Sequence, residues 1–323
     1  MSFKEVTRSD DGILYMAYYF PQFHYIPENR VNGKLYTDWD FIRANDQHSF
    51  TPHMYYRLDN TDPEIFAKQD QLAQKYKIGV FIFYHYWLDN KLIMNLPADM
   101  FIREIRQTKF MFLWDNESGF LGKQMYDSAE AHAYQLIRFF SHPNYLTYDD
   151  GSKPFIVYLT RPFENEMAYL ETFTSFLSKF NIKLRIGYNW MQYKNEFFSP
   201  PTADFVSEFA PHHQANQSRG SLADGYSINP SLFTDHWQGA MTSWDSRPRV
   251  QSNRTSQKKT FVQHKPNGHV SVTEFKSQIK KIKNNLLPNN KNKIITLFAW
   301  NEWSEGGVLE SSQEFGSQFL ECL

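Results

Sequence analysis

Residues 78–87 read Ile-Gly-Val-Phe-Ile-Phe-Tyr-His-Tyr-Trp, an apolar run that ends in polar and aromatic side chains. Strands buried on both faces, as in parallel sheets, have continuous apolar sequences of this kind rather than an alternating pattern. Further β-rich runs recur along the chain at residues 13–20, 109–114, 154–159, 184–190, 203–209, 239–244 and 293–300. Together they predict eight strands.

Amphipathic helices are predicted between some of these strands. Thr61-Asp62-Pro63 provides a cap and a first-turn proline, residues 128–140 and 165–180 have helical periodicity, and Ser271 begins a capping box with Glu274. Strands that alternate with helices indicate a parallel sheet. Eight of them in one chain favour a single TIM-like (β/α)₈ barrel, although a doubly wound sheet has the same alternation.

The chain of 323 residues shows no internal repeat and no convincing linker, so we expect one catalytic domain over residues 1–323. Two polar stretches, 210–235 and 245–270, are too long for ordinary connections and indicate functional or mobile loops. The sequence gives no indication of the oligomeric state.

The net charge of −1 argues against nucleic acid or an anionic membrane surface as a partner. Cys322 is the single cysteine, which excludes an intrachain disulfide and argues against thiol catalysis. Residues 1–11 are charged and no apolar run approaches the roughly 18 residues of a membrane span, so we expect no secretory signal, no span and a cytoplasmic location.

Aromatic residues make up 17% of the chain. Their rings can stack on the C–H faces of sugars, but an aromatic core explains the same figure, so the positions of the rings decide between the two. In a barrel the site lies beyond the C-terminal ends of the strands, where this chain is rich in polar and aromatic residues. The candidate substrate-binding residues there are Tyr18, His24, Glu28, His85, Trp87, Trp114, Asn116, Glu117, Asn189, Trp244, Asn301 and Trp303. We predict that the rings of Trp87, Trp114 and Trp244 line the cleft rather than the core.

Glu302 and Glu305 are the candidate catalytic residues. If the last strand runs into a helical turn, residues three apart share a face, with Cβ atoms roughly 5–6 Å apart. Two carboxylates that close cannot both ionise easily, so their pKa values split into those of an acid and a base. Cleavage of a glycosidic bond needs this combination. A capping or surface pair has the same spacing, but the flanking tryptophans favour function.

Metal and nucleotide chemistry have weaker support in the sequence. His24 and His85 are interpreted as pocket hydrogen-bond donors or core histidines, because no metal-ligand spacing of His or Cys is present. Phosphate-binding glycine loops are absent, so we expect no cofactor. Residues 38–40 read Asp-Trp-Asp, as in the metal–nucleotide motif of many glycosyltransferases, but they follow a Pro/Asn/Gly-rich loop rather than a buried strand. We therefore favour that interpretation less.

Several blocks resemble the WbsX-type family of O-antigen and capsule gene clusters, whose members are usually labelled glycosyltransferases. They are Ala-Tyr-Tyr-Phe-Pro-Gln-Phe-His at 17–24, Ile-Pro-Glu-Asn at 26–29, residues 79–87, His-Pro-Asn-Tyr-Leu at 142–146, Asp-Gly-Ser-Lys-Pro at 150–154, Trp-Asp at 244–245 and Ala-Trp-Asn-Glu-Trp-Ser-Glu-Gly at 299–306. The last block is also similar to glycoside hydrolase family 99, the endo-α-mannosidases.

That second resemblance implies a (β/α)₈ barrel and a role for each acid. Glu302 would remove the proton of the sugar 2-hydroxyl, whose oxygen attacks the anomeric carbon and gives a 1,2-anhydro sugar. Glu305 would be the acid and later the base for water. The chain departs from the WbsX pattern at 114–119, where a second tryptophan is missing, and at Ser311, where a proline is expected. The first departure puts the sugar specificity of that subsite in doubt.

Three hypotheses follow for a chain that acts on an oligo- or polysaccharide. The first is a retaining endo-α-glycosidase or transglycosylase, favoured by the carboxylate pair and by the lack of a nucleotide loop. The second is a sugar-nucleotide glycosyltransferase, favoured by the WbsX label and the expected cytoplasmic location. The third is an inactive glycan-binding barrel, which predicts the loss of one acid, whereas both are present.

Overall fold

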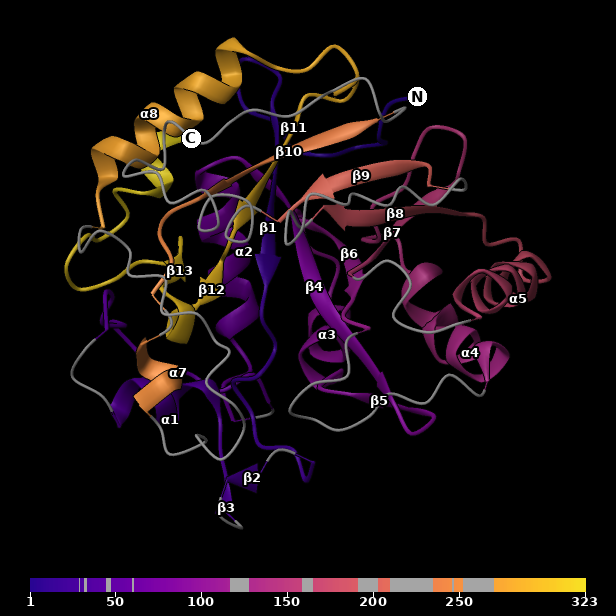
Figure 1. Cartoon of the computed structure of the whole chain (residues 1–323), viewed down its shortest axis with the longest axis horizontal. Coiled ribbons are helices and arrows are strands. Elements are labelled where there is room, and N and C mark those ends of the chain that lie inside the picture. Colours follow the sequence, from indigo (N-terminus) through magenta and orange to yellow (C-terminus); the bar gives the residue numbers. More distant parts are fainter. Residues whose placement is uncertain are drawn as a thin grey trace.

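The computed structural model describes residues 1–28, 30–31, 34–44, 48–59, 61–116, 128–158, 165–190, 203–209, 235–245, 247–251 and 270–323. Within them, eight parallel strands form a closed barrel, which confirms the prediction (Figure 1). The strands are β1 (Leu14–Tyr19), β4 (Ile78–Leu88), β6 (Lys109–Trp114), β7 (Lys153–Val157), β8 (Leu184–Trp190), β9 (Phe205–Glu208), β10 (His236–Met241) and β11 (Ile294–Phe298). Because β1 pairs with both β4 and β11, the sheet has no open edge there, and a doubly wound sheet is excluded.

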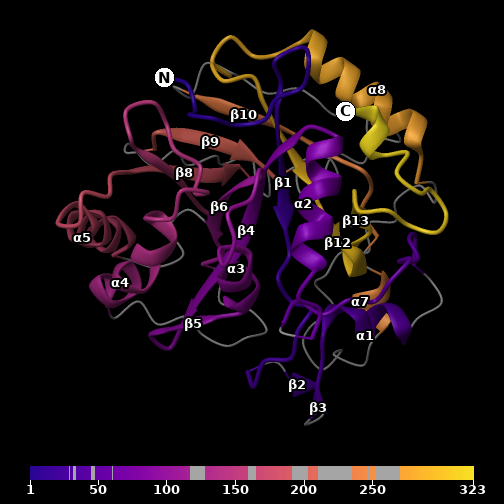
Figure 2. The ribbon, with the colours of Figure 1, turned by 180° about the vertical axis from the view of Figure 1, so that it is seen from behind.

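Helices lie around the barrel and, in the case of α1 (Asp38–Arg43) and α7 (Arg247–Gln251), at the C-terminal end of its strands (Figures 1 and 2). The others are α2 (Ile65–Lys75), α3 (Leu96–Phe101), α4 (Ala129–Phe140), α5 (Glu166–Ser178) and α8 (Val272–Asn284). Ser271 caps α8 as predicted, and Ser128 caps α4, each accepting a backbone N–H. The helix α2 begins later than predicted, at Ile65, and leaves Pro63 in the preceding turn. None of the described helices is long and apolar enough to cross a membrane.

One short strand extends the sheet of the barrel, and a separate hairpin lies outside it. The strand β5 (Lys91–Ile93) pairs antiparallel with the end of β4. The hairpin of β2 (Arg30–Val31) and β3 (Lys34–Leu35) projects below the barrel in Figure 1, near α1 and α7. That end is the C-terminal end of the strands, and both chain termini lie toward the opposite end.

The N-terminal segment packs against the barrel at that opposite end. Phe3 stacks on Tyr148 with a centroid distance of 4.1 Å, and Trp237 lies edge-on to Phe3 while stacking on Phe205 at 4.0 Å. These rings are buried, so this end is filled by packed side chains and leaves the C-terminal end for the site.

Candidate active site

The amide of Asn301 fixes the chain that carries the two acids. Beyond β11, the N–H of Trp300 donates to the carbonyl of Tyr18 at 2.7 Å, which continues the pairing with β1. The Asn301 side chain then accepts from the N–H of Phe20 at 2.7 Å and donates to its carbonyl at 3.0 Å. These two hydrogen bonds to the backbone of Phe20 fix the Asn301 side chain, and they therefore fix the position of the neighbouring Glu302.

The acids lie on a tight turn between two short strands. The strand β12 (Asn301–Glu302) pairs with β13 (Gly307–Val308), and a 3₁₀ turn, η3 (Trp303–Glu305), joins them. Residues three apart eclipse one another in a 3₁₀ turn, so Glu302 and Glu305 lie on one side. The predicted turn is present, although it begins at Trp303 rather than directly after Ala299.

A single guanidinium contacts both acids. Arg249 of α7 donates from Nη1 to Oε1 of Glu305, and its Nη2 lies 3.2 Å from Oε2 of Glu302. The exposed fractions of the side chains are 27% for Arg249, 4% for Glu302 and 19% for Glu305. The pair is therefore close enough to share one cation, and solvent reaches it from the side of Glu305.

Asp38, at the start of α1, is fully buried and accepts hydrogen bonds from the turn that carries the acids. Its Oδ2 accepts the N–H of Ser304 at 3.1 Å, and its Oδ1 accepts the Ser304 hydroxyl at 2.6 Å. The same Oδ1 lies 3.3 Å from Nη2 of Arg249, whose Nε donates to the Ser304 hydroxyl at 2.6 Å. Asp38 and Ser304 thus hold both the turn and the arginine.

Burial and neighbouring carboxylates raise the pKa values of both acids. Burial raises the pKa of Glu302 well above its ordinary value, and the charge of Glu305 adds to the rise, while Arg249 and a hydrogen bond from Tyr84 oppose it. Burial also raises the pKa of Glu305, against the effect of Arg249. The pair consequently retains a proton at higher pH than an exposed glutamate would, which is the property that acid–base catalysis needs.

Three predicted residues lie on the outer face of the barrel wall. His85, Trp87 and Trp114 have fully or almost fully buried side chains. Trp87 stacks on His132 of α4 with a centroid distance of 4.6 Å, and Trp114 stacks on Tyr169 of α5 at 5.5 Å. The prediction that these two rings line the cleft rather than the core is wrong, because successive side chains of a strand face opposite sides and these face the helices.

His85 is likewise a packing residue and not a pocket donor. Its Nε2 lies 2.6 Å from Nε2 of His132, whose Nδ1 contacts the Tyr169 hydroxyl at 3.0 Å. Burial lowers the pKa of His85 to about 3 and that of His132 well below its ordinary value, so both rings are neutral at pH 7. Tyr84, one position before His85, faces inward and interacts with Glu302.

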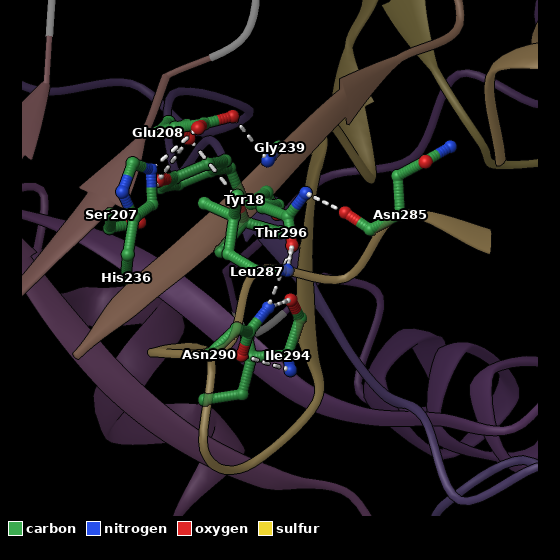
Figure 3. Close-up of polar contacts among 11 residues, drawn as sticks. Tyr18, Ser207, Glu208, His236, Gly239, Asn285, Leu287, Asn290, Ile294 and Thr296 are labelled. Atoms are coloured by element: carbon green, nitrogen blue, oxygen red, sulfur yellow. Dashed lines mark hydrogen bonds and ion pairs between the residues drawn. The ribbon is translucent and has the colours of Figure 1, made fainter. Parts of the chain in front are cut away.

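Tyr18 and Asn189 belong to the polar interior of the barrel, and Figure 3 shows Tyr18 there beside Ser207 and Glu208. The Tyr18 hydroxyl lies 3.2 Å from the amide oxygen of Asn189, 2.8 Å from the Ser207 hydroxyl and 3.3 Å from the carbonyl of Glu208. The Glu208 carboxylate accepts from His236 at 2.6 Å. These contacts join β1, β8 and β9, so Tyr18 and Asn189 have a structural role, and their contact with substrate stays a prediction.

The remaining predicted residues have different surroundings. His24 is buried against the carbonyl of Pro21 at 3.0 Å, and burial lowers its pKa to about 4. Trp303 packs against Trp39 and donates to Glu310 at 3.2 Å. Glu28 is exposed, Asn116 is buried and Trp244 is half-buried, while Glu117 and most of the two long polar stretches lie outside the described residues.

Sequence reasoning missed Arg249, Asp38 and Tyr84. Arg249 lies in the polar stretch 245–270, which signalled function without singling out a residue. Asp38 belongs to the Asp-Trp-Asp motif, which was considered as a metal–nucleotide site, whereas in the structure Asp38 contacts Ser304 and Arg249. Tyr84 belongs to the polar and aromatic end of the run 78–87, but the pattern of that run does not reveal which of its side chains face inward.

The chain resembles solved structures of the same fold. A GH99 endo-α-mannosidase from Bacteroides thetaiotaomicron in complex with Bis-Tris-propane superposes with a TM-score of 0.55 at 15% identity, covering 94% of this chain and 88% of the other. Another structure of a GH99 endo-α-mannosidase from this organism gives a TM-score of 0.54 at 14% identity, with 95% and 91% covered. These likenesses confirm the barrel fold.

Relatives in sequence are longer than this chain. The uncharacterized protein WxcX from two strains of Xanthomonas campestris pv. campestris is 24% identical over 353 residues, covering 95% of this chain. The match covers 48% of that protein, so the chain spans about half the length of the curated relatives it matches. The sequence pattern of the family described as Glycosyltransferase WbsX matches residues 15–231 and 221–323. With nearly the whole chain matched, this carbohydrate-active barrel belongs to the WbsX glycosyltransferase family.

Proposed function

We propose that the chain cleaves or transfers glycosidic bonds of a bacterial-type polysaccharide, such as O-antigen or capsule, by retaining endo-α-glycosidase-like chemistry. The observation that carries this proposal is the acid pair, in which Glu302 and Glu305 lie on one turn, share the guanidinium of Arg249 and have raised pKa values. The resemblance of residues 301–306 to glycoside hydrolase family 99 supports the same assignment.

In the proposed reaction each acid handles one proton. Glu302 takes the proton of the sugar 2-hydroxyl, and the freed oxygen attacks the anomeric carbon. The bond to the leaving oxygen breaks as Glu305 donates its proton to that oxygen, which gives a 1,2-anhydro sugar. Water then opens the three-membered ring at the anomeric carbon, with Glu305 accepting the water proton and Glu302 returning its proton to the 2-oxygen.

The charge around the pair favours a neutral sugar over a diphosphate donor. Asp38, Glu302 and Glu305 surround one arginine, so the immediate surroundings are net negative and repel phosphate groups. The family description indicates transfer, and a sugar hydroxyl that replaces water in the second step would produce transfer without a nucleotide. A sugar-nucleotide glycosyltransferase remains the second candidate on that description, and an inactive glycan-binding barrel is the third.

The test compares Glu302→Gln and Glu305→Gln with the unmodified chain on a polysaccharide and on an aryl α-glycoside. Both changes remove a titrating group and keep its shape, so we expect both to abolish turnover of the polysaccharide. An aryl leaving group needs little protonation. Glu305→Gln should therefore regain part of its activity on the aryl glycoside, and Glu302→Gln should not.

A 2-deoxy-2-fluoro substrate tests the internal nucleophile. The unmodified chain should fail to cleave it, because fluorine cannot replace the attacking 2-oxygen. Efficient cleavage would overturn the anhydro route, and activity that survives both glutamine changes would overturn the role of the pair. Dependence on an added nucleotide sugar would establish the glycosyltransferase reading instead.

A further inference from the structure

Arg249 bonds to both acids at the place where the proposed reaction needs a sugar. Its Nη1 donates to Glu305 and its Nη2 to Glu302, so the guanidinium bridges the two carboxylates. A reacting sugar ring must also lie between them, with its 2-hydroxyl at Glu302 and its leaving oxygen at Glu305. In the free protein the guanidinium therefore takes one oxygen of each carboxylate that the sugar would contact.

From this geometry we propose that Arg249 is a resident counter-ion of the acid pair, which the sugar displaces on binding. The proposal rests on the proposed function in one respect, that the sugar binds at the pair. It makes Arg249 a positioning residue whose withdrawal opens the site.

The charge that develops during the reaction favours the same exchange. The transition state of glycosidic cleavage has oxocarbenium character, with positive charge on the ring oxygen and the anomeric carbon. A guanidinium that stayed between the carboxylates would repel that charge and would compete for the oxygens that stabilise it. When Arg249 withdraws, the negative charge of Glu302 and Glu305 is free to stabilise the positive charge that develops on the sugar.

A second set of partners is in place for the displaced group. Asp38 and Ser304 already contact the guanidinium, through Nη2 at 3.3 Å and Nε at 2.6 Å, and Asp38 is fully buried. A rotation of the arginine side chain toward these two residues keeps its charge paired with a carboxylate. The ring of Phe20, with its centroid 5.3 Å from the guanidinium carbon, offers a further favourable contact.

The same helix provides a matched control. Arg247, two residues earlier on α7, pairs with the buried carboxylate of Asp245 at 2.6 and 2.7 Å and is half exposed. Arg247→Met therefore removes the same charge from the same helix without removing a ligand of the acid pair.

The test measures binding of a small cation to the full chain by calorimetry, without any turnover. The probe is Bis-Tris-propane, a polyhydroxylated amine that is protonated near neutral pH, and sorbitol is the neutral comparison. If Arg249 occupies the carboxylates in the free protein, Arg249→Met should bind the amine about tenfold more tightly than the unmodified chain or more. Sorbitol, a neutral polyol that also has to displace the guanidinium, should gain affinity too but less than the amine, and Arg247→Met should change neither.

Further variants keep the result interpretable. Arg249→Gln removes the charge and retains hydrogen bonding, so it replaces Arg249→Met if that variant fails to fold. Adding Glu305→Gln to Arg249→Met should cancel the gain, which places the bound amine at the pair. A gain below about threefold, including no binding by any variant, would overturn the proposal, as would weaker binding of both ligands. Because no cleavage is measured, a chain that failed every test of the proposed function could still pass this one.

Discussion

The N–H of Asp245 donates to the carbonyl of Glu305 at 2.6 Å, and the Cβ of Asp245 lies 2.8 Å from where a side chain on Gly306 would begin. The segments that follow β10 and β11 therefore pack against each other directly beside the acid pair. Gly306 also has a φ of +67°, a conformation that favours glycine. Both facts require a residue without a side chain at this position.

Gly306→Ala should lower both stability and activity. We expect a loss of about 1 kcal/mol from the positive φ alone and a further loss from the contact with Asp245, which displaces Glu305. Gly316→Ala is the control, because Gly316 has a φ of +53° and no atom within 4 Å of the added Cβ. Urea unfolding that gave the two variants equal free energies would contradict the role of Asp245.

Trp114→Ala should destabilise the protein by about 3–5 kcal/mol, because it removes a fully buried ring that stacks on Tyr169. Chemical denaturation measures the loss. Trp244→Ala removes a half-buried ring and should cost less. A Trp114→Ala variant of normal stability that bound glycan more weakly would restore the interpretation of this ring as part of the cleft.

The pair of His85 and His132 should make the protein less stable as the pH falls below about 6.5. Burial holds the pKa of His85 at about 3, below its unfolded value, so the unfolded chain binds more protons between these values and stability is lost with falling pH. One such histidine should cost about 2 kcal/mol between pH 7 and pH 5. Urea unfolding of His85→Phe at both pH values should show a smaller difference than the unmodified chain, and an unchanged difference would contradict the assignment.

Tyr84→Phe should move the acidic limb of the kcat/KM profile to higher pH. The hydrogen bond from Tyr84 lowers the pKa of Glu302, so its loss raises that pKa, and the base then becomes available only at higher pH. Tyr19→Phe is a matched control, because that hydroxyl donates to Gln69 at 2.7 Å and does not contact the acid pair. A shift of equal size in both variants would show that the change is not specific to Glu302.

The sequence could predict the barrel and the acid pair because both depend on local patterns. Strand-length apolar runs indicated the eight strands, and the spacing of three placed Glu302 and Glu305 together. That His85 and Trp87 face the helices could not be predicted from the sequence, because a strand buried on both faces is apolar on both. Arg249 could not be paired with Glu302 either, since 53 residues separate them and one sequence records no long-range contacts.

The two hydrogen bonds between Asn301 and Phe20 have a consequence for how specificity can evolve in this family. They attach the segment that carries the acid pair to the closing seam of the barrel, between β1 and β11, so the position of Glu302 does not depend on the polar stretch 210–235. If that stretch differs between relatives, the glycan that we propose as substrate can differ with it, while the acid pair keeps its position. Chimeric chains that exchange the polar stretch 210–235 between family members should therefore inherit the donor's substrate and keep the host's catalytic groups.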